Sequence, residues 1–279
     1  TLADSPLKLR AIGWLCGLHD YNDSSFYGWC RSHGCTDQEV GGFSSPGRRA
    51  LKFTTNARAA VEHMAAIRRE LNGMFMAVRA DDIPGFPTQT LDVKLIDLDK
   101  RDRDAVDAAC REMSDRMQSR ARSPLAELNR ERERIEFHMA ETLADMAYAK
   151  SQDGVSAVCF FCYTEPRERF ERKLEGYGVQ VCRICGGQKD EERLAMMDAF
   201  QRNVLHIASV QIKAGGAAVN LHDELKERPR ESYLIPAYEA ADVKQALGRI
   251  RRCEGTHAVQ HFVIAAGTIQ ERVAATLER

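Results

Sequence analysis

The second half of the sequence predicts an α/β lobe built around a parallel β-sheet. Short apolar runs alternate with helical patterns from residue 155 to residue 265. Strands that are apolar on both faces are typical of parallel sheets covered by helices, and alternation with helices favours the same architecture. The expected strands are Val155–Tyr163, Val179–Ile184, Val204–Val210, Tyr233–Ile235 and His261–Ala265, and the expected helices are Glu165–Leu174, Glu191–Gln201 and Ala241–Arg251. Because such sheets bind ligands beyond the carboxyl ends of their strands, we expect functional loops after Tyr163, Ile184 and Val210.

The first 150 residues are expected to be mainly helical. Apolar residues at helical spacing predict helices over Leu7–Leu18, Ser25–Ser32 and Ala57–Leu71, and alternation predicts an edge strand within Leu91–Leu98. Between residues 100 and 150, two apolar stripes flank Ser123-Pro124. Proline interrupts a helix, so the pattern predicts a helical hairpin packed against a lobe. A coiled-coil dimer is the alternative.

Composition limits the possible functions. Forty basic and 41 acidic side chains give a net charge of −1, so any nucleic-acid binding depends on a local patch. No apolar run approaches the roughly 20 residues that cross a bilayer. Nine cysteines, an odd number, favour reduced thiols and a cytoplasmic location. Because the chain begins with Thr1, we expect it to be part of a longer protein.

Two groups of cysteines have spacings that suggest zinc, and we reject both. Cys159, Cys162, Cys182 and Cys185 form two CxxC pairs, but each pair falls in a predicted strand, where residues three apart point to opposite faces. The second group lacks a knuckle turn and consists of Cys16, His19, Cys30, His33 and Cys35.

Asp242–Arg252, with the sequence DVKQALGRIRR, contains two arginines that could bind phosphate. On a helix, Gln245, Arg249 and Arg252 lie on one face, and two guanidiniums suit a phosphate. A solvated basic helix face is the alternative.

Two glycine-containing turns follow predicted strands and could approach a nucleic-acid backbone. Gly186 and Gly187 precede Lys189, and Gly216 follows the predicted strand that contains Ser209. Glycine permits close approach of backbone amides to phosphate, although an ordinary turn would use it too. No GK[ST] phosphate loop occurs in the 279 residues, and we interpret the acidic stretch that begins at Asp190 as a helix start, not a magnesium site.

Three stretches, in order and spacing, resemble the second RecA-like (P-loop NTPase type) lobe of superfamily-two helicases, most closely the Swi/Snf-like branch and its phage-encoded members. They are SVQIKAGGAAVNLHD from Ser209, DVKQALGRIRR from Asp242 and GTIQER from Gly267. VRADDIPGFP, from Val78, loosely resembles the connector of that branch. This sequence departs from the family at Ala218, where a glycine is usual, and has two extra residues before Ala214.

The resemblance implies a set of site residues and ligands. Arg249 and Arg252 would act as arginine fingers on ATP held with Mg2+ by the first lobe. The other residues implied to contact nucleotide are Gln245, Gly248, Gly216 and Asn220. Those implied to contact nucleic acid, DNA first and RNA second, are Thr164, Gly186, Gly187, Lys189, Ser209 and Lys213.

The expected organisation is the trailing part of a first helicase lobe with a connector (1–100), a helical insertion (101–150) and the second RecA-like lobe (151–279). We expect an ATP-dependent helicase or translocase whose other lobe is missing here, so that this segment alone is inactive. A non-hydrolysing nucleic-acid-binding or interaction module is the alternative. A GK[ST] loop upstream of Thr1 would favour the motor.

Overall fold

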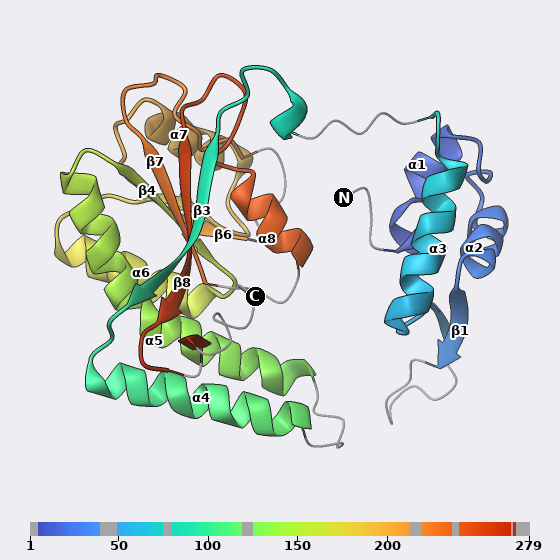
Figure 1. Cartoon of the computed structure of the whole chain (residues 1–279). Coiled ribbons are helices and arrows are strands. Elements are labelled where there is room, and N and C mark those ends of the chain that lie inside the picture. The colour runs from blue at the N-terminus through green and yellow to red at the C-terminus, as the bar shows by residue number, and fades with distance from the viewer. Residues whose placement is uncertain are drawn as a thin grey trace. The chain divides into compact units, whose positions relative to one another are not determined.

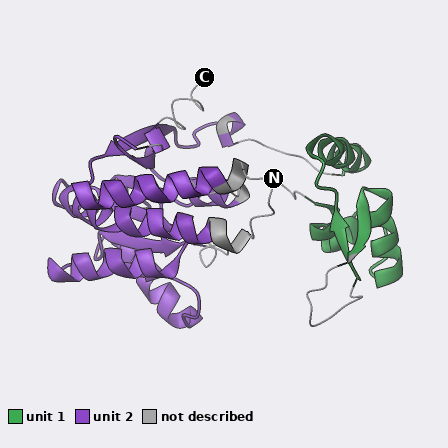
Figure 2. Cartoon of the chain, turned by 90° about the horizontal axis from the view of Figure 1, so that it is seen from below, with its two compact units in different colours: residues 1–79 green, residues 80–279 purple. Residues whose placement is uncertain are grey.

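The computed structural model describes residues 5–39, 49–74, 80–118, 125–212, 219–235, 240–268 and 270–271. Residues 1–79 and 80–279 form two compact units, here called the N-terminal unit and the sheet unit (Figure 2). The boundaries expected at residues 100 and 150 both fall inside the sheet unit. The assignment of the N-terminal unit to a first helicase lobe stays a prediction.

The sheet unit contains six parallel strands in the order β3-β8-β7-β4-β6-β5 (Figure 1). They are β3 (Gln89–Ile96), β4 (Ser156–Phe161), β5 (Cys182–Ile184), β6 (Ile207–Gln211), β7 (Arg230–Leu234) and β8 (Ala258–Ala265). The predicted parallel α/β class is confirmed, and the predicted edge strand is β3, which pairs with β8.

Helices cover both faces of this sheet, as the apolar strands require. One face packs against α4 (Lys100–Gln118), α5 (Leu125–Gln152) and α6 (Thr164–Gly176), and the other against α7 (Asp190–Gln201) and α8 (Ala240–Leu247). Along β4, Cys159 and Phe161 join the core on the α5 side, whereas Val158 and Phe160 join the core on the α7 side. Each fully buried phenylalanine contributes about 1.5–3 kcal/mol.

The long helices α4 and α5 form the predicted hairpin. They pack against each other and share the core that lies under the sheet (Figure 1). Val106 of α4 and Met139 and Leu143 of α5 are fully buried in that core. Ser123-Pro124, the predicted break, lies outside the described residues.

The helix predicted over Ala241–Arg251 is shorter than expected. The structure ends α8 at Leu247, and residues 248–250 form a turn. Gly248, a poor helix former, follows the last helical residue. The Arg249 amide donates to the Ala246 carbonyl, three residues back, at 3.0 Å. Arg249 and Arg252 therefore do not lie on one helical face with Gln245.

The N-terminal unit is small and mixed in structure. Its elements are a 3-10 turn (Pro6–Lys8), α1 (Arg10–Leu15), α2 (Asp23–Ser32), β1 (Cys35–Glu39), β2 (Arg49–Phe53) and α3 (Ala57–Glu70). The antiparallel pair of β1 and β2 was not predicted, because β1, CTDQE, is mostly polar. Leu9, Phe26 and Ile67 lie in the core of this unit.

A short 3-10 turn, Ala80–Asp82, begins the sheet unit and leads through Pro87 to β3. In the described part of the chain, no helix is long and apolar enough to cross a bilayer.

Candidate functional site

The predicted site residues lie at two opposite edges of the sheet. Thr164 and Gly186 follow the carboxyl ends of β4 and β5. By contrast, α8 carries the chain away from the carboxyl end of β7, so that Arg251 lies beside Pro87, just before the amino end of β3. The arginines are therefore not at the carboxyl edge, where the fold alone predicts ligands.

Arg249 and Arg252 are held close together in the turn that follows α8, residues 248–255, here called the arginine turn. Arg249 is 9% exposed. Burial, and then the charge of Arg252, lower the pKa of the Arg249 guanidinium below its usual range. Within the described residues, the buried Nε of Arg252 has no hydrogen-bond partner. Two neighbouring, partly desolvated cations favour an anion, because it would offset their mutual repulsion.

Backbone hydrogen bonds fix this turn in place. The Leu221 amide donates to the Arg249 carbonyl at 3.0 Å, and the Gly255 amide donates to the Arg252 carbonyl at 3.2 Å. A Cβ atom at Gly255 would lie 3.2 Å from the Arg252 carbonyl oxygen and 3.3 Å from the His222 ring. The path of the chain at Gly255 therefore leaves little room for a side chain.

Most of the predicted nucleotide contacts lie near this turn. Asn220 is exposed and directly precedes Leu221, and its carbonyl accepts a hydrogen bond from Gln201 Nε2 at 2.8 Å. Gly248 begins the turn. Gln245 is exposed on the last turn of α8, and Gly216 lies outside the described residues.

Two buried polar residues that the sequence analysis missed, Asp223 and His222, lie beside the arginine turn. Asp223 is 1% exposed, and its Oδ2 accepts a hydrogen bond from the Thr256 hydroxyl at 3.3 Å. Burial lowers the pKa of His222 below its usual range. The available signal was the polar LHD stretch between the glycine turn and β7.

At the carboxyl edge, Gln211 joins two of the predicted nucleic-acid loops. Its Nε2 donates to the Thr164 hydroxyl at 3.3 Å, and its Oε1 accepts from the Gly186 amide at 3.4 Å. Thr164, Gly186, Gly187 and Lys189 are all exposed. A polyanionic backbone therefore has access to these groups. Apart from its position at a strand end, nothing in the sequence pattern indicated Gln211.

Glu136 of α5, also missed, holds the loop that precedes Thr164. The helix-capping position of α6, Tyr163, makes no side-chain capping bond. Instead, the Glu136 carboxylate accepts the Cys162 amide at 2.7 Å. Glu136 is 2% exposed, and burial raises its pKa to about 8 despite the hydrogen bonds that stabilise its charged form.

Ser209, predicted to touch nucleic acid, faces the interior. It is fully buried, and its hydroxyl donates to Glu171 of α6. Glu171 also pairs with Arg167 and, at 2.8 Å, with Arg183 Nε. This geometry gives Ser209 a structural role, and Lys213 lies outside the described residues.

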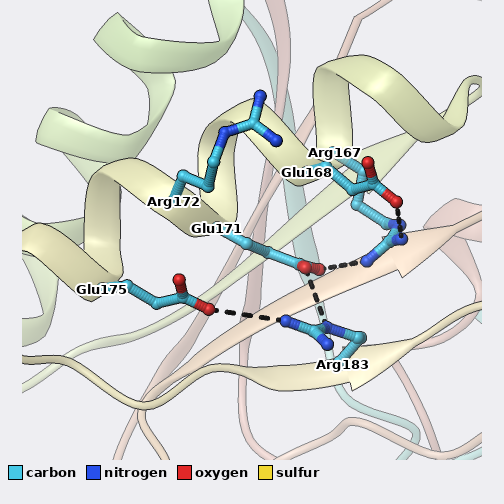
Figure 3. Close-up of a pocket in the computed structure, with 6 residues that line it drawn as sticks. All are labelled: Arg167, Glu168, Glu171, Arg172, Glu175 and Arg183. Atoms are coloured by element: carbon cyan, nitrogen blue, oxygen red, sulfur yellow. Dashed lines mark hydrogen bonds and ion pairs between the residues drawn. The ribbon is translucent and has the colours of Figure 1, made fainter.

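Figure 3 shows the pocket beside this ion-pair network. The pocket has a volume of about 210 Å³. Its lining residues are Arg167, Glu168, Glu171, Arg172, Glu175 and Arg183. Arg183 joins the buried Glu171 and, at 3.6 Å, the exposed Glu175. Three acidic and three basic side chains line the pocket, so its lining carries no net charge that would favour a cationic or an anionic ligand.

The two CxxC pairs do not lie inside strands as predicted, because β4 ends at Phe161 and β5 at Ile184, just before Cys162 and Cys185. Cys159 lies in the core on the α5 side of the sheet, and Cys162 packs against the core on the opposite side. Among the residues that the structure describes, no group of three or more histidine, cysteine or acidic side chains could hold a metal ion.

No protein-family model matches the chain. Over 152 residues, 54% of the chain, it is 27% identical to "Putative ATP-dependent RNA helicase L364" of Acanthamoeba polyphaga mimivirus. The match spans 28% of that relative's length, so little more than a quarter of the relative is covered.

Two solved structures are similar to the chain. The C-terminal part of the Fun30 ATPase domain has a TM-score of 0.48 and 12% identity, covering 68% of this chain and 89% of that one. The Sulfolobus solfataricus SWI2/SNF2 ATPase C-terminal domain has a TM-score of 0.45 and 14% identity, covering 69% and 85%. These scores are too low to identify the fold, which rests on the strand order and parallel register described above.

Proposed function

We infer that this chain is the C-terminal part of an ATP-dependent nucleic-acid helicase or translocase, and that the sheet unit is its second RecA-like lobe. The observation that carries the proposal is the pair of neighbouring guanidiniums in a turn fixed by backbone hydrogen bonds: Arg249 is 9% exposed, and the buried Nε of Arg252 has no hydrogen-bond partner within the described residues. The mimivirus relative, whose name describes an RNA helicase, supports the same class of function.

In this proposal the two edges of the sheet have different tasks. The arginine turn stabilises the charge that develops on the phosphoryl group as ATP is hydrolysed. Gly248 begins this turn, Asn220 precedes the Leu221 that bonds to it, and Gln245 is exposed on the last turn of α8. At the carboxyl edge, Thr164 and Lys189, with the amides of Gly186 and Gly187, contact a nucleic-acid backbone without reading its bases. DNA is the first candidate, and RNA is the second.

The chain's residues fit the terminal phosphates of ATP better than they fit Mg2+. Two guanidiniums suit phosphate oxygens, whereas the described residues contain no cluster of ligands for a metal. We propose that a first lobe holds the nucleotide and the metal, because the 279 residues contain no GK[ST] loop. Bound Mg2+ would neutralise charge on the phosphates. The 279 residues alone should show no ATPase activity.

Nucleic-acid-stimulated ATP turnover of the complete encoded protein tests the proposal. Arg249→Ala and Arg252→Ala should each lower kcat by about three to five powers of ten, as loss of an arginine finger does. Affinity for ATP should change little, because the first lobe makes most contacts. The control is Arg111→Ala, since Arg111 is exposed on α4 and pairs only loosely with Asp107 at 3.5 Å. If both variants turn over ATP like the control, the motor function is wrong.

A further inference from the structure

The arginine turn is fastened to the segment that leads into β3, here called the connector segment, residues 80–88. Arg251 lies between the two proposed fingers, and its Nε donates to the Pro87 carbonyl at 2.7 Å. Its guanidinium also lies over the Phe86 ring, 5.1 Å from the centroid. A hydrogen bond and a cation–π contact thus join residues far apart in the sequence.

Further contacts continue this attachment toward the sheet. The His257 ring bonds the Thr88 hydroxyl through Nδ1 at 2.7 Å and the Thr90 hydroxyl through Nε2 at 3.0 Å. The Ala258 amide donates to the Thr88 carbonyl at 3.1 Å, and the β3–β8 ladder begins at Gln89. The chain after Arg252 is therefore held along the start of β3, and Arg251 extends that attachment up to the fingers.

We propose that Arg251 is a positioning residue that ties the orientation of Arg249 and Arg252 to the connector segment. The inference rests on the function proposed above. Arg249 is anchored through its carbonyl to Leu221, and Arg252 through its carbonyl to Gly255. Arg251 adds side-chain contacts, to the Pro87 carbonyl and the Phe86 ring, that join the turn to the chain entering this unit. A shift of about 1 Å in a catalytic group can cost roughly 100-fold in rate.

The consequence is a link between the connector segment and phosphate sensing. A movement of residues 86 and 87 would move the guanidinium of Arg251, and with it the turn that carries both fingers. Conversely, an anion bound by the fingers would stabilise one position of the connector segment. Arginine suits this position because one guanidinium both donates an N–H to the Pro87 carbonyl and stacks on the Phe86 ring.

The test is ATP turnover of the complete encoded protein carrying Arg251→Ala. We expect kcat to fall about 10-fold to 100-fold with KM for ATP unchanged, a smaller loss than for Arg249→Ala. Arg251→Lys keeps a cation over Phe86 and should recover part of the rate. Phe86→Leu removes the aromatic face that Arg251 contacts and should also lower kcat. Because the two residues share one contact, the double variant should lose no more kcat than Arg251→Ala alone.

The matched control is Arg228→Ala. Arg228 is another half-buried arginine that donates to backbone carbonyls, those of Ser151 and Val155, without touching the connector segment. It should lower the melting temperature but leave kcat near wild type. If Arg251→Ala keeps kcat within twofold of the Arg228 variant while Arg249→Ala is inactive, the positioning role of Arg251 is wrong and the proposed ATPase function is retained. If Arg249→Ala is active too, the proposed function itself fails.

Discussion

The buried carboxylate of Glu171 allows a quantitative test of what holds α6 against the sheet. It is 2% exposed and accepts hydrogen bonds from the Arg167 guanidinium and from Arg183 Nε, as Figure 3 shows. It also accepts the Ser209 hydroxyl, so it joins α6 to both β5 and β6. Glu171→Gln keeps the shape and one acceptor oxygen but removes the charge. Arg167, itself 4% exposed, then loses its buried counter-charge.

The expected loss is large because the partner that remains is also buried. Breaking a buried ion pair by removing one partner costs about 3–5 kcal/mol. Glu175→Gln is the control: its carboxylate pairs with the same Arg183 at 3.6 Å, but its side chain is 61% exposed. An exposed pair contributes about 0–1 kcal/mol. The two variants thus remove the same charge, from the same helix and next to the same arginine, and differ in burial.

The sequence supplies an internal reference for the measurement. Both tryptophans, Trp14 and Trp29, are in the N-terminal unit, so their fluorescence during urea unfolding reports on that unit. Far-ultraviolet circular dichroism reports mainly on the helices α4 to α8 of the sheet unit. Glu171→Gln should shift the dichroism midpoint and leave the fluorescence midpoint in place. A loss below about 1 kcal/mol, equal to that of Glu175→Gln, would refute the reasoning.

Three further predictions concern a buried acid, a surface lysine and the cysteines. Burial raises the pKa of Glu136 from 4.5 to about 8, so the folded protein holds this proton to higher pH than the unfolded chain, and the free energy of unfolding falls as pH rises from 4.5 to 8. At about 1.4 kcal/mol per pH unit the total fall is on the order of 5 kcal/mol, and Glu136→Gln should abolish it. Urea unfolding at pH 5 and pH 9 measures it, and an unchanged slope would contradict it. Lys189→Ala should weaken binding equally for all nucleic-acid sequences, as measured by fluorescence anisotropy. The slope of the logarithm of the binding constant against the logarithm of salt concentration should become about 1 less steep. A loss of affinity confined to one sequence would argue against backbone contact. Elemental analysis should find no stoichiometric zinc, and about one zinc per chain that disappears in Cys159→Ser or Cys182→Ser would overturn that expectation.

Periodicity was sufficient to predict the elements of the sheet unit, because strands buried on both faces and amphipathic helices leave a local pattern. It predicted β4, α6 and α7 close to their observed bounds and identified β3 as an edge strand. It failed for β1, whose polar residues do not resemble a strand, and for the end of α8. The helical spacing of apolar residues continues past Gly248, but the helix α8 ends at Leu247.

The sequence by itself determined the α/β class, the helical hairpin and the residue types of the proposed phosphate and nucleic-acid sites. Tertiary structure decided where those residues lie: Arg249 and Arg252 in a turn at the amino edge, Thr164 and Gly186 at the carboxyl edge, and Ser209 in the interior. Local patterns specify which residues share a helix or a strand. The partners of Ser209, Glu136 and Arg251 are distant in sequence, and only the packing of strands and helices brings them into contact.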